Sequence, residues 1–350
     1  AGVTFKFSER HNFWRNKRMA FTTFEQIYDP HDFAAAVQNY TLEKSAFVQS
    51  GILERSDAYT QKLISGGEVG DLPYIDDLTG DESVASGVAS EQISPDPITM
   101  GHTLYQKDFR TKSWGVPNLV ARIAGEDLIG AAVKLVGDYR LRQQQKTLIA
   151  KLTGFVASNV ANNAGDMVKN ISIDTTAALT DAQKISFNAI LEATLTMGDR
   201  FDEITAMVMN SVQWGQLMRI DAANVVRKSD IEPFNRYYGR IVIIDDSIGF
   251  EQGTNKQIHT CYLLGAGSVA FATANERAVI VRDEKAGMGY GATELVTSYD
   301  QLMHIKGTTS KAALTANGKS PINDTYKLAA SHERVFERKA IPLAFLKTNG

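Results

Sequence analysis

The chain has 350 residues, of which 43% are hydrophobic and 22% are charged, and its formal net charge is −3 at pH 7. A chain of this length can bury a substantial core, and two domains are the prior expectation. The slightly acidic balance argues against a protein whose main task is to bind nucleic acid tightly, and no apolar run is long enough to span a membrane.

The first 18 residues form a basic segment without clear periodicity, and Met19 then opens a segment of different composition. Two interpretations stay open. Either Met19 is the natural start and the preceding residues are translated upstream sequence, since Trp14-Arg15 can be encoded by a stretch that contains a ribosome-binding GGAG, or the segment is a true basic arm. An amino-terminal peptide of the native protein that begins well before Met19 would exclude the first interpretation. After Pro30, apolar residues at helical spacing predict one or two short helices over residues 30–54.

Residues 66–115 predict a long two-stranded ribbon with an acidic outgoing part and a basic returning part. No Lys or Arg stands between Lys62 and Lys107. A ribbon of this kind has too little apolar surface to be stable alone, so we expect it to be mobile or to lie against another molecule. Clustered carboxylates also suit a divalent cation, but there is no DxDxDG loop and we predict no metal site. The carboxylates near the tip include Asp76, Asp77, Asp81 and Glu82.

Residues 125–154 predict one long helix around which the chain is organised. Glu126 and Asp127 place negative charge in its first turn, and Gly154 stands where a C′ glycine ends a helix. The helix would span about 28 residues and roughly 42 Å. Its apolar face changes halfway, so we expect it to join two different bodies. The first face carries Leu128, Ala132, Leu135 and Tyr139, the second carries Leu141, Leu148, Leu152 and Phe155, and the basic residues are Arg140, Arg142, Lys146 and Lys151.

Residues 159–274 predict helices that alternate with buried strands. A polar connector with a possible strand at residues 168–173 leads to a helix that Thr180 and Asp181 can cap, and Gly198 ends it. A continuous apolar strand follows at residues 204–209, then a helix capped by Asn210, then a buried strand at residues 240–244 with a turn at Asp245-Asp246. This order is typical of an α+β or α/β layer with short links.

The most enzyme-like motif is Gly265-Ala-Gly267-Ser-Val-Ala270, with Asp283 further on, which has the outline of a dinucleotide-binding fingerprint. We reject it because residues 278–282 already form the next strand and leave no room for a βαβ unit. His332-Glu333 resembles half of a zinc motif, but Phe336 stands where the second histidine is needed. Cys261 lies in an apolar run, which is typical of a buried, reduced thiol. The sequence therefore predicts no catalytic, cofactor-binding or metal-binding residue.

The carboxyl-terminal part is predicted to be rich in strands. Residues 278–287 and 293–307 are strand-like, with a glycine-rich tip between them. Residues 311–325 are predicted to form a loop, and residues 340–346 a last strand. Pro342 suggests that this last strand lies at an edge or begins a ladder.

In order and spacing, a set of short motifs resembles the major capsid proteins of tailed double-stranded DNA phages with the Hong Kong 97-type fold, in particular the gp13-like group. The motifs cover nearly everything after about Phe47. They are Ala58-Tyr-Thr with Gly66 and Leu72-Pro73, Asp138-Tyr139 with Arg142 and Leu152-Thr-Gly154, Met207-Val-Met-Asn210-Ser211, Gly239-Arg240-Ile-Val, Asp245-Asp246-Ser247, Arg282-Asp283 through Gly289, Leu295 to His304-Ile-Lys-Gly307, and Glu333-Arg-Val with Lys339, Ile341 and Asn349.

This resemblance implies an α+β fold with an N-terminal arm, an E-loop β-hairpin, a long spine helix, a peripheral (P) domain and an axial (A) domain. The arm would be residues 1–65, and the E-loop, which lies across a neighbouring subunit in the family, would be residues 66–116. The P domain would comprise residues 117–165 and 275–307, and the A domain residues 166–274 and 308–350.

The resemblance further implies a structural protein, not an enzyme, that self-assembles into the icosahedral head shell around phage double-stranded DNA. Partners would be other copies in hexamers and pentamers, non-specifically held DNA, and portal, scaffold and decoration proteins, with no membrane and no cofactor. The place of action would be the virion, after assembly in the host cytoplasm. We predict no covalent crosslink.

We expect the acidic ribbon to meet a basic surface of a neighbouring copy, so that reversing the charges of Asp76, Asp77 and Asp81 impairs assembly. The residues expected at this contact are Asp76, Asp77, Asp81 and Glu82 on one side and Arg140, Arg142 and Lys146 on the other. Two alternatives remain: an encapsulin-type compartment of the same fold, and an NAD-binding oxidoreductase that would depend on the Gly265 region. The contents of purified particles and an NAD-binding assay would discriminate among them.

Overall fold

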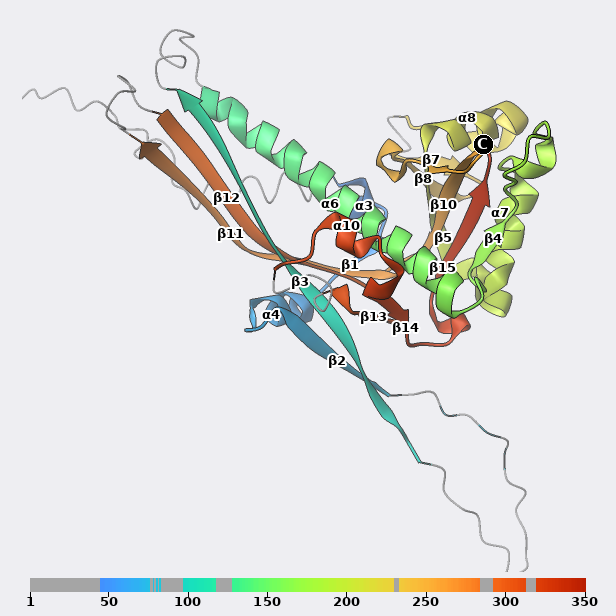
Figure 1. Cartoon of the computed structure of the whole chain (residues 1–350), viewed down its shortest axis with the longest axis horizontal. Coiled ribbons are helices and arrows are strands. Elements are labelled where there is room, and N and C mark those ends of the chain that lie inside the picture. The colour runs from blue at the N-terminus through green and yellow to red at the C-terminus, as the bar shows by residue number, and fades with distance from the viewer. Residues whose placement is uncertain are drawn as a thin grey trace, which may run out of the picture.

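The computed structural model describes residues 45–75, 78, 80, 82, 97–117, 128–229, 233–283, 292–312 and 319–350. Helices and strands are mixed along the chain, as the α+β expectation requires (Figure 1). The predictions for the first 44 residues, including a start at Met19, lie outside the described residues, and so do Asp76, Asp77 and Asp81.

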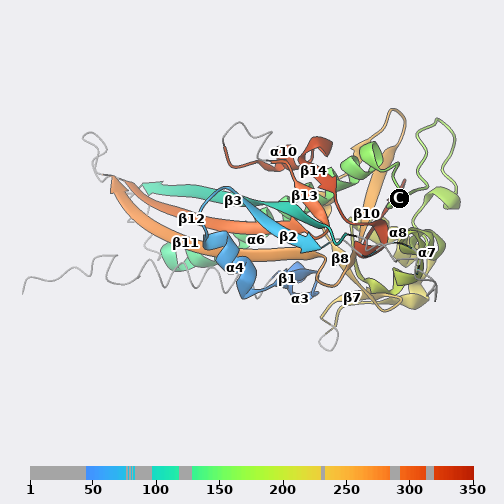
Figure 2. The same ribbon diagram turned by 90° about the horizontal axis from the view of Figure 1, so that it is seen from below.

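A long, twisted sheet of five strands forms one body of the molecule (Figures 1 and 2). Its order is β1-β11-β12-β3-β2, in which β1 is parallel to β11 and the other neighbours are antiparallel. The second half of β3 pairs with β12 and its first half pairs with β2, so the β2–β3 hairpin extends past the end of the sheet. The strands are β1 (Leu53–Arg55), β2 (Val69–Ile75), β3 (Met100–Pro117), β11 (Val269–Asp283) and β12 (Ala292–Ile305).

A second sheet has eight strands, seven of them in the order β4-β15-β10-β5-β8-β7-β6, with β9 paired to β10. The side chains of β5 alternate between two cores, Ala206 and Val208 on one face and Met207 and Met209 on the other. Both faces are buried from Ala206 to Met209, which explains why this part of the strand is apolar. The strands are β4 (Val168–Asn170), β5 (Ile204–Met209), β6 (Val225–Val226), β7 (Asn235–Tyr237), β8 (Arg240–Ile244), β9 (Glu251–Gln252), β10 (Gln257–Gly265) and β15 (Leu343–Thr348).

Two helices cover one face of the eight-stranded sheet, and their starts test the predicted caps. Helix α8 (Ser211–Ile220) begins at Asn210, whose side chain accepts the Gln213 N–H, as predicted. Helix α7 (Phe187–Thr194) is capped by Ser186 instead of Thr180, so the predicted start was wrong. A separate short turn at Asp181–Gln183 uses Thr180 and Gln183 in a capping box, because a Thr followed by a Gln three residues later caps whatever turn comes next.

Helix α6 (Leu128–Asn162) is 35 residues long, or roughly 52 Å, and lies along both bodies (Figure 1). The predicted single long helix is confirmed, but the predicted end at Gly154 was wrong. Gly154 lies inside the helix where the carboxyl-terminal segment crosses it, and an added Cβ would be 1.9 Å from the Tyr326 carbonyl oxygen. This glycine therefore permits a close crossing and does not end the helix.

Over residues 135–147 of α6, the buried stripe is largely polar and differs from the predicted apolar face, whereas the side chains of Leu128 and Ala132 lie outside the described part. Leu135 is 65% exposed, whereas Val136, Arg140, Gln144 and Thr147 are buried. These buried residues follow the spacing of one helix face. The sequence therefore contains the helical periodicity, but mostly polar side chains occupy the buried positions.

The second half of α6 holds the two sheets together in one shared core. Leu148, Leu152 and Phe155 pack in a cluster with Phe271 of the five-stranded sheet and Phe345 of the eight-stranded sheet. The expectation that this helix joins two bodies is therefore confirmed.

Shorter elements complete the fold. Between Lys311 and Pro342, small elements pack on α6. After Pro342, β15 enters the eight-stranded sheet between β4, which forms its edge, and β10. The remaining elements are α3 (Ala46–Gln49), α4 (Asp57–Ile64), β13 (Thr308–Ser310), α10 (Asn323–Tyr326), β14 (His332–Arg334) and short 3-10 turns at Leu195–Glu203, Ala222–Asn224, Asp246–Ile248, Ala329–Ser331 and Arg338–Ala340.

Candidate subunit-contact site

The β2–β3 hairpin has one covered face and one uncovered apolar face. On the covered face, Leu72 and Tyr105 pack with Leu63 of α4. The alternation of a strand sends the neighbouring side chains to the other side. There Ile75 is 66% exposed and Met100, directly opposite it in the pairing, is 64% exposed. Other large apolar residues exposed on the hairpin or just beyond its strands are Val69, Leu78, Ile98 and Leu104.

Polar side chains share this uncovered face with the apolar ones, since His102 Nδ1 lies 2.9 Å from the Asp71 carboxylate. Isolated exposed apolar residues are ordinary, but several of them on one sheet face are typical of an interaction surface. We name this group, Val69, Ile75, Met100 and Leu104, the hairpin face.

The basic residues predicted for a contact do not share one surface. Arg142 and Lys146 are exposed and lie one helical turn apart on α6. Arg140 is buried, its Nη1 lies 2.5 Å from the Glu276 carboxylate, and its guanidinium stacks 4.7 Å from the Tyr299 ring centre. A β-bulge at Asn275, whose φ is +51°, aims Glu276 at the helix. Arg140 therefore attaches α6 to the long sheet within one chain.

Of the predicted acidic partners, Glu82 is exposed, and the other three lie outside the described residues. Whether these carboxylates contact a neighbouring copy stays a prediction. Of the three basic residues predicted at this contact, Arg142 and Lys146 are exposed and can contact a neighbouring copy, whereas Arg140 is buried.

A buried ionic network, which the sequence analysis missed, fixes the base of the hairpin. Asp108 of β3 is fully buried and accepts from Lys151 Nζ of α6 at 3.1 Å and from the Tyr326 hydroxyl. Lys151 Nζ also donates to the Met303 carbonyl oxygen of β12 at 2.7 Å and lies 4.2 Å from the Tyr326 ring centre. Burial lowers the pKa of Lys151, and the Asp108 carboxylate opposes that shift. The network joins α6, β3, β12 and the carboxyl-terminal segment.

Two buried histidines beside this network predict a loss of stability in acid. Burial, together with the positive charge of Lys151, lowers the pKa of His304 to about 3 and that of His332 to about 4. Both stay neutral in the folded chain at pH 5, whereas in the unfolded chain they titrate near 6.5 and bind protons. The free energy of unfolding should therefore fall as the pH drops through 6.5, by about 2 kcal/mol for each histidine at pH 5.

Urea unfolding of the unassembled chain at pH 8 and at pH 5 measures this loss. The double variant His304→Gln, His332→Gln should lose most of the difference between the two pH values. If the double variant shows the same difference in the free energy of unfolding between pH 8 and pH 5 as the wild type, the histidines do not cause the acid sensitivity and carboxylates do.

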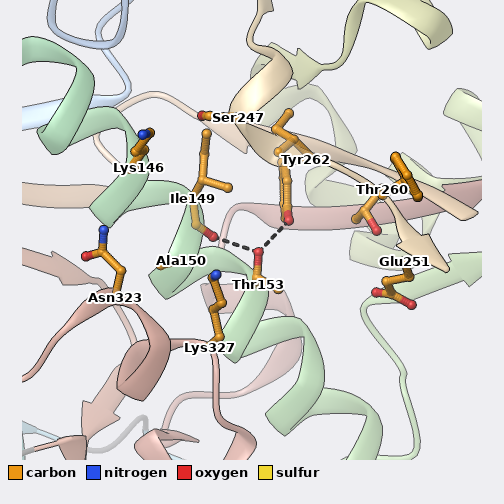
Figure 3. Close-up of a pocket in the computed structure, with 13 residues that line it drawn as sticks. Lys146, Ile149, Ala150, Thr153, Ser247, Glu251, Thr260, Tyr262, Asn323 and Lys327 are labelled. Atoms are coloured by element: carbon orange, nitrogen blue, oxygen red, sulfur yellow. Dashed lines mark hydrogen bonds between the residues drawn. The ribbon is translucent and has the colours of Figure 1, made fainter.

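A cleft opens between α6, α10 and the β9–β10 side of the eight-stranded sheet (Figure 3). We name it the α6 cleft; its volume is about 480 Å³. Thr153 donates to the Ile149 carbonyl oxygen at 2.8 Å and lies 2.8 Å from the Tyr262 hydroxyl, so the inner wall is already hydrogen-bonded (Figure 3). Lys146 and Lys327 stand at its rim. Lys146 belongs to the predicted contact set, whereas Lys327 was not recognised from the sequence.

The motif at Gly265 has a structural explanation. It turns the chain from β10 of one sheet directly into β11 of the other, and no helix intervenes. Gly267 adopts φ +64°, and its N–H donates to the Gly51 carbonyl oxygen at 2.8 Å. Cys261 is buried, as expected, and burial raises the pKa of its thiol to about 12.

Within the described ranges, no three His, Cys, Asp or Glu side chains are grouped so that they could hold a metal ion. No helix in the described part of the chain is long and apolar enough to cross a membrane.

Solved structures with the same arrangement of elements define the class of protein. The capsid protein of Ralstonia phage GP4 aligns with a TM-score of 0.57 at 11% identity, covering 88% of this chain and 90% of that one. The cyanophage Pam1 capsid protein aligns with a TM-score of 0.53 at 13% identity, covering 85% and 89%. The fold is therefore that of tailed-phage capsid proteins, the Hong Kong 97-type fold that the sequence predicted.

The sequence places the chain within this class. The profile of the family described as Gp13-like, major capsid protein 13-like, matches residues 134–337, and the chain belongs to this family. The major capsid protein of Bacillus phage SPP1 is 28% identical over 336 residues, which cover 94% of this chain and 98% of that protein. The chain is thus a phage major capsid protein, a virion component whose copies form the head shell. The encapsulin and oxidoreductase alternatives are not favoured.

Proposed function

We propose that copies of this chain form the hexamers and pentamers of an icosahedral head shell that encloses double-stranded DNA. The uncovered hairpin face is the observation that carries the proposal, because Ile75 and Met100 are 66% and 64% exposed in one copy. Burying the exposed part of one such side chain contributes on the order of 1 kcal/mol. Repetition by symmetry multiplies these small contributions into a stable shell.

We further propose that the chain is divided into the segments and domains that the family resemblance suggests. Residues 66–116 act as an E-loop that lies on a neighbouring copy, and residues 1–65 act as an arm. The P domain comprises residues 117–165 and 275–307, and the A domain comprises residues 166–274 and 308–350. The two sheets support two such bodies, although β11 begins at Val269, so the proposed boundary at residue 275 falls inside this strand.

The net charge of −3 supports a container that holds DNA without binding it tightly at any one point. The role is structural, without catalysis. Assembly takes place in the host cytoplasm with portal, scaffold and decoration proteins as partners. Purified particles should protect double-stranded DNA from nuclease, and particles filled with protein cargo would contradict the proposed content.

Introducing negative charge into the hairpin face tests whether this face contacts a neighbouring copy. The double variant Ile75→Asp, Met100→Asp should fold, because both side chains are mostly exposed in one copy. It should yield at least about tenfold fewer particles, since burying two unpaired carboxylates costs well over the 1.4 kcal/mol that a tenfold change requires. Negative-stain microscopy of sedimented particles measures the yield, and circular dichroism verifies the fold.

The matched control is Leu195→Asp, Leu328→Asp, which adds the same charge at two exposed leucines outside the hairpin. Its particle yield should stay closer to that of the wild type. Equal yields from the hairpin variant and the wild type would reject the hairpin face as a contact.

A further inference from the structure

A second cavity lies between the long sheet and α6. Its volume is about 340 Å³, which is within the range of small-ligand pockets, and we name it the β3 pocket. Strands β3 and β12 and helices α6 and α10 contribute its wall. The polar side chains that matter for binding are Arg110 and Lys112 from β3, Tyr299 from β12, Gln143 from α6 and Asn323 from α10.

The chain does not balance the positive charge that β3 brings to this pocket. Arg110 is half-buried, and Asp108, the carboxylate 3.5 Å from its guanidinium, already pairs with Lys151 at 3.1 Å. One negative charge therefore faces two cations. Lys112 is exposed and forms no ion pair with any residue that the structure describes. The β12 residues opposite the two pocket cations are an uncharged tyrosine and an uncharged threonine.

The rest of the wall offers hydrogen-bond donors and little negative charge. Asp324 also lines the pocket, but its side chain is 80% exposed and pairs with Lys327 at 3.0 Å, so its charge is already compensated. The hydroxyl of Thr147 donates to Asn323 Oδ1 at 3.0 Å, and this bond does not use the Nδ2 donor of Asn323. Burial raises the pKa of Tyr299 to about 12, so its hydroxyl keeps its proton at neutral pH.

A phosphate group matches this wall better than a carboxylate does. It carries three strong acceptor oxygens and up to two negative charges, whereas a carboxylate carries two oxygens and one charge. The planar guanidinium of Arg110 can donate two parallel hydrogen bonds to phosphate oxygens, and the ammonium of Lys112 attracts them as a point charge.

We propose that the β3 pocket binds a phosphate group through Arg110, Lys112 and the amide of Asn323. The phosphate belongs to a small phosphate ligand or to a nucleic-acid backbone, which share this chemistry. Bound there, it joins β3 of the long sheet to α10 of the carboxyl-terminal segment. The site lies within one copy, so the proposal does not depend on the formation of a shell.

Isothermal titration of the unassembled full-length chain with inorganic pyrophosphate tests the site. We expect saturable binding of one ligand per chain. Lys112→Glu should fold, because Lys112 is exposed, and should raise the dissociation constant at least about tenfold, since it puts a like charge beside the ligand. The matched control Lys228→Glu makes the same charge change at an exposed position outside the pocket and should change the constant less than about twofold.

Three results of this titration would overturn the proposal. They are a wild-type chain that shows no saturable binding, a Lys112→Glu variant that binds like the wild type, and an equal loss in Lys228→Glu, which would indicate attraction by the overall charge only.

Thermal unfolding gives a second measurement of the same site. Phosphate stabilises folded proteins in general because it is excluded from their surfaces, so the variant supplies the baseline. On exchange of potassium chloride for potassium phosphate at equal ionic strength, the melting temperature of the wild type should rise more than that of Lys112→Glu. Equal rises would contradict a specific site.

Competition with a short DNA duplex identifies the source of the phosphate. A duplex that displaces pyrophosphate, and does so less well as salt is added, assigns the site to a nucleic-acid backbone. A duplex that leaves the pyrophosphate bound assigns it to a small phosphate ligand. Both results retain the site, and neither bears on whether the chain forms particles.

Discussion

Replacing Asp108 by asparagine is expected to lower the free energy of unfolding by about 3–5 kcal/mol, because it leaves the buried ammonium of Lys151 without its counter-charge. Asp108 is fully buried and Lys151 is nearly so. The same change also removes the charged acceptor of the Tyr326 hydroxyl. Four segments should therefore loosen together.

Urea unfolding of the unassembled chain, followed by circular dichroism, measures this loss. The matched control is Glu251→Gln, which breaks the exposed pair with Lys347 and should cost less than about 1 kcal/mol. The double variant Asp108→Asn, Lys151→Met should recover part of the loss, because no unpaired charge stays buried. If Asp108→Asn costs no more than the control, the network does not stabilise the base of the hairpin.

Replacing Gly154 by alanine is expected to destabilise the chain by roughly 3 kcal/mol or more, although alanine is the better helix former. The new Cβ would lie 1.9 Å from the Tyr326 carbonyl oxygen and 2.8 Å from the His332 ring. Neither neighbour moves easily, since one is backbone and the other ring is buried. Helix α6 and the segment that crosses it would have to separate.

The matched control is Gly215→Ala in α8, where no heavy atom lies within 4 Å of the new Cβ. This change should stabilise the chain by about 0.5–1 kcal/mol, the ordinary gain of alanine over glycine in a helix. A lower melting temperature for Gly154→Ala together with a higher one for Gly215→Ala would support the close crossing of α6 and the carboxyl-terminal segment. A stabilising Gly154→Ala would mean that α6 and the carboxyl-terminal segment do not approach as described.

The eight-stranded sheet was the part most accessible from the sequence. Residues 204–209 form β5 with the predicted bounds, and Asn210 caps α8, because an uninterrupted apolar run and a capping side chain are local signals. In the other sheet, β12 (Ala292–Ile305) nearly matches the predicted strand at residues 293–307, whereas β11 begins at Val269, nine residues before the predicted start at residue 278. The ribbon was predicted as two strands, and β2 and β3 form its two described sides.

The buried stripe at residues 135–147 of α6 could not be predicted from apolar periodicity, because Arg140, Gln144 and Thr147 are polar. Arg140 looks like a surface cation in the sequence, and only the bulge at Asn275 brings Glu276 beneath it. Gly154 resembled a helix end for a related reason. Its true cause, the crossing backbone near Tyr326, is 172 positions away in the chain and leaves no local signal.

For the candidate contact site, the sequence could identify charged residues but not the apolar surface and the cleft that lie near them in the fold. Arg142 and Lys146 are exposed as their composition suggested. The apolar hairpin face, the α6 cleft and Lys327 depend on register and on tertiary packing, since a one-residue shift of β2 against β3 would turn Ile75 to the covered side. No local pattern specifies that choice.

Cryo-electron microscopy of particles built from this chain tests the central claim most directly, that one copy becomes complete only when its hairpin lies on another. We expect closed shells in which the density of Ile75 and Met100 contacts a neighbouring copy. Shells in which both side chains face solvent, or a purified chain that stays a compact monomer under every condition that supports assembly of its relatives, would contradict it.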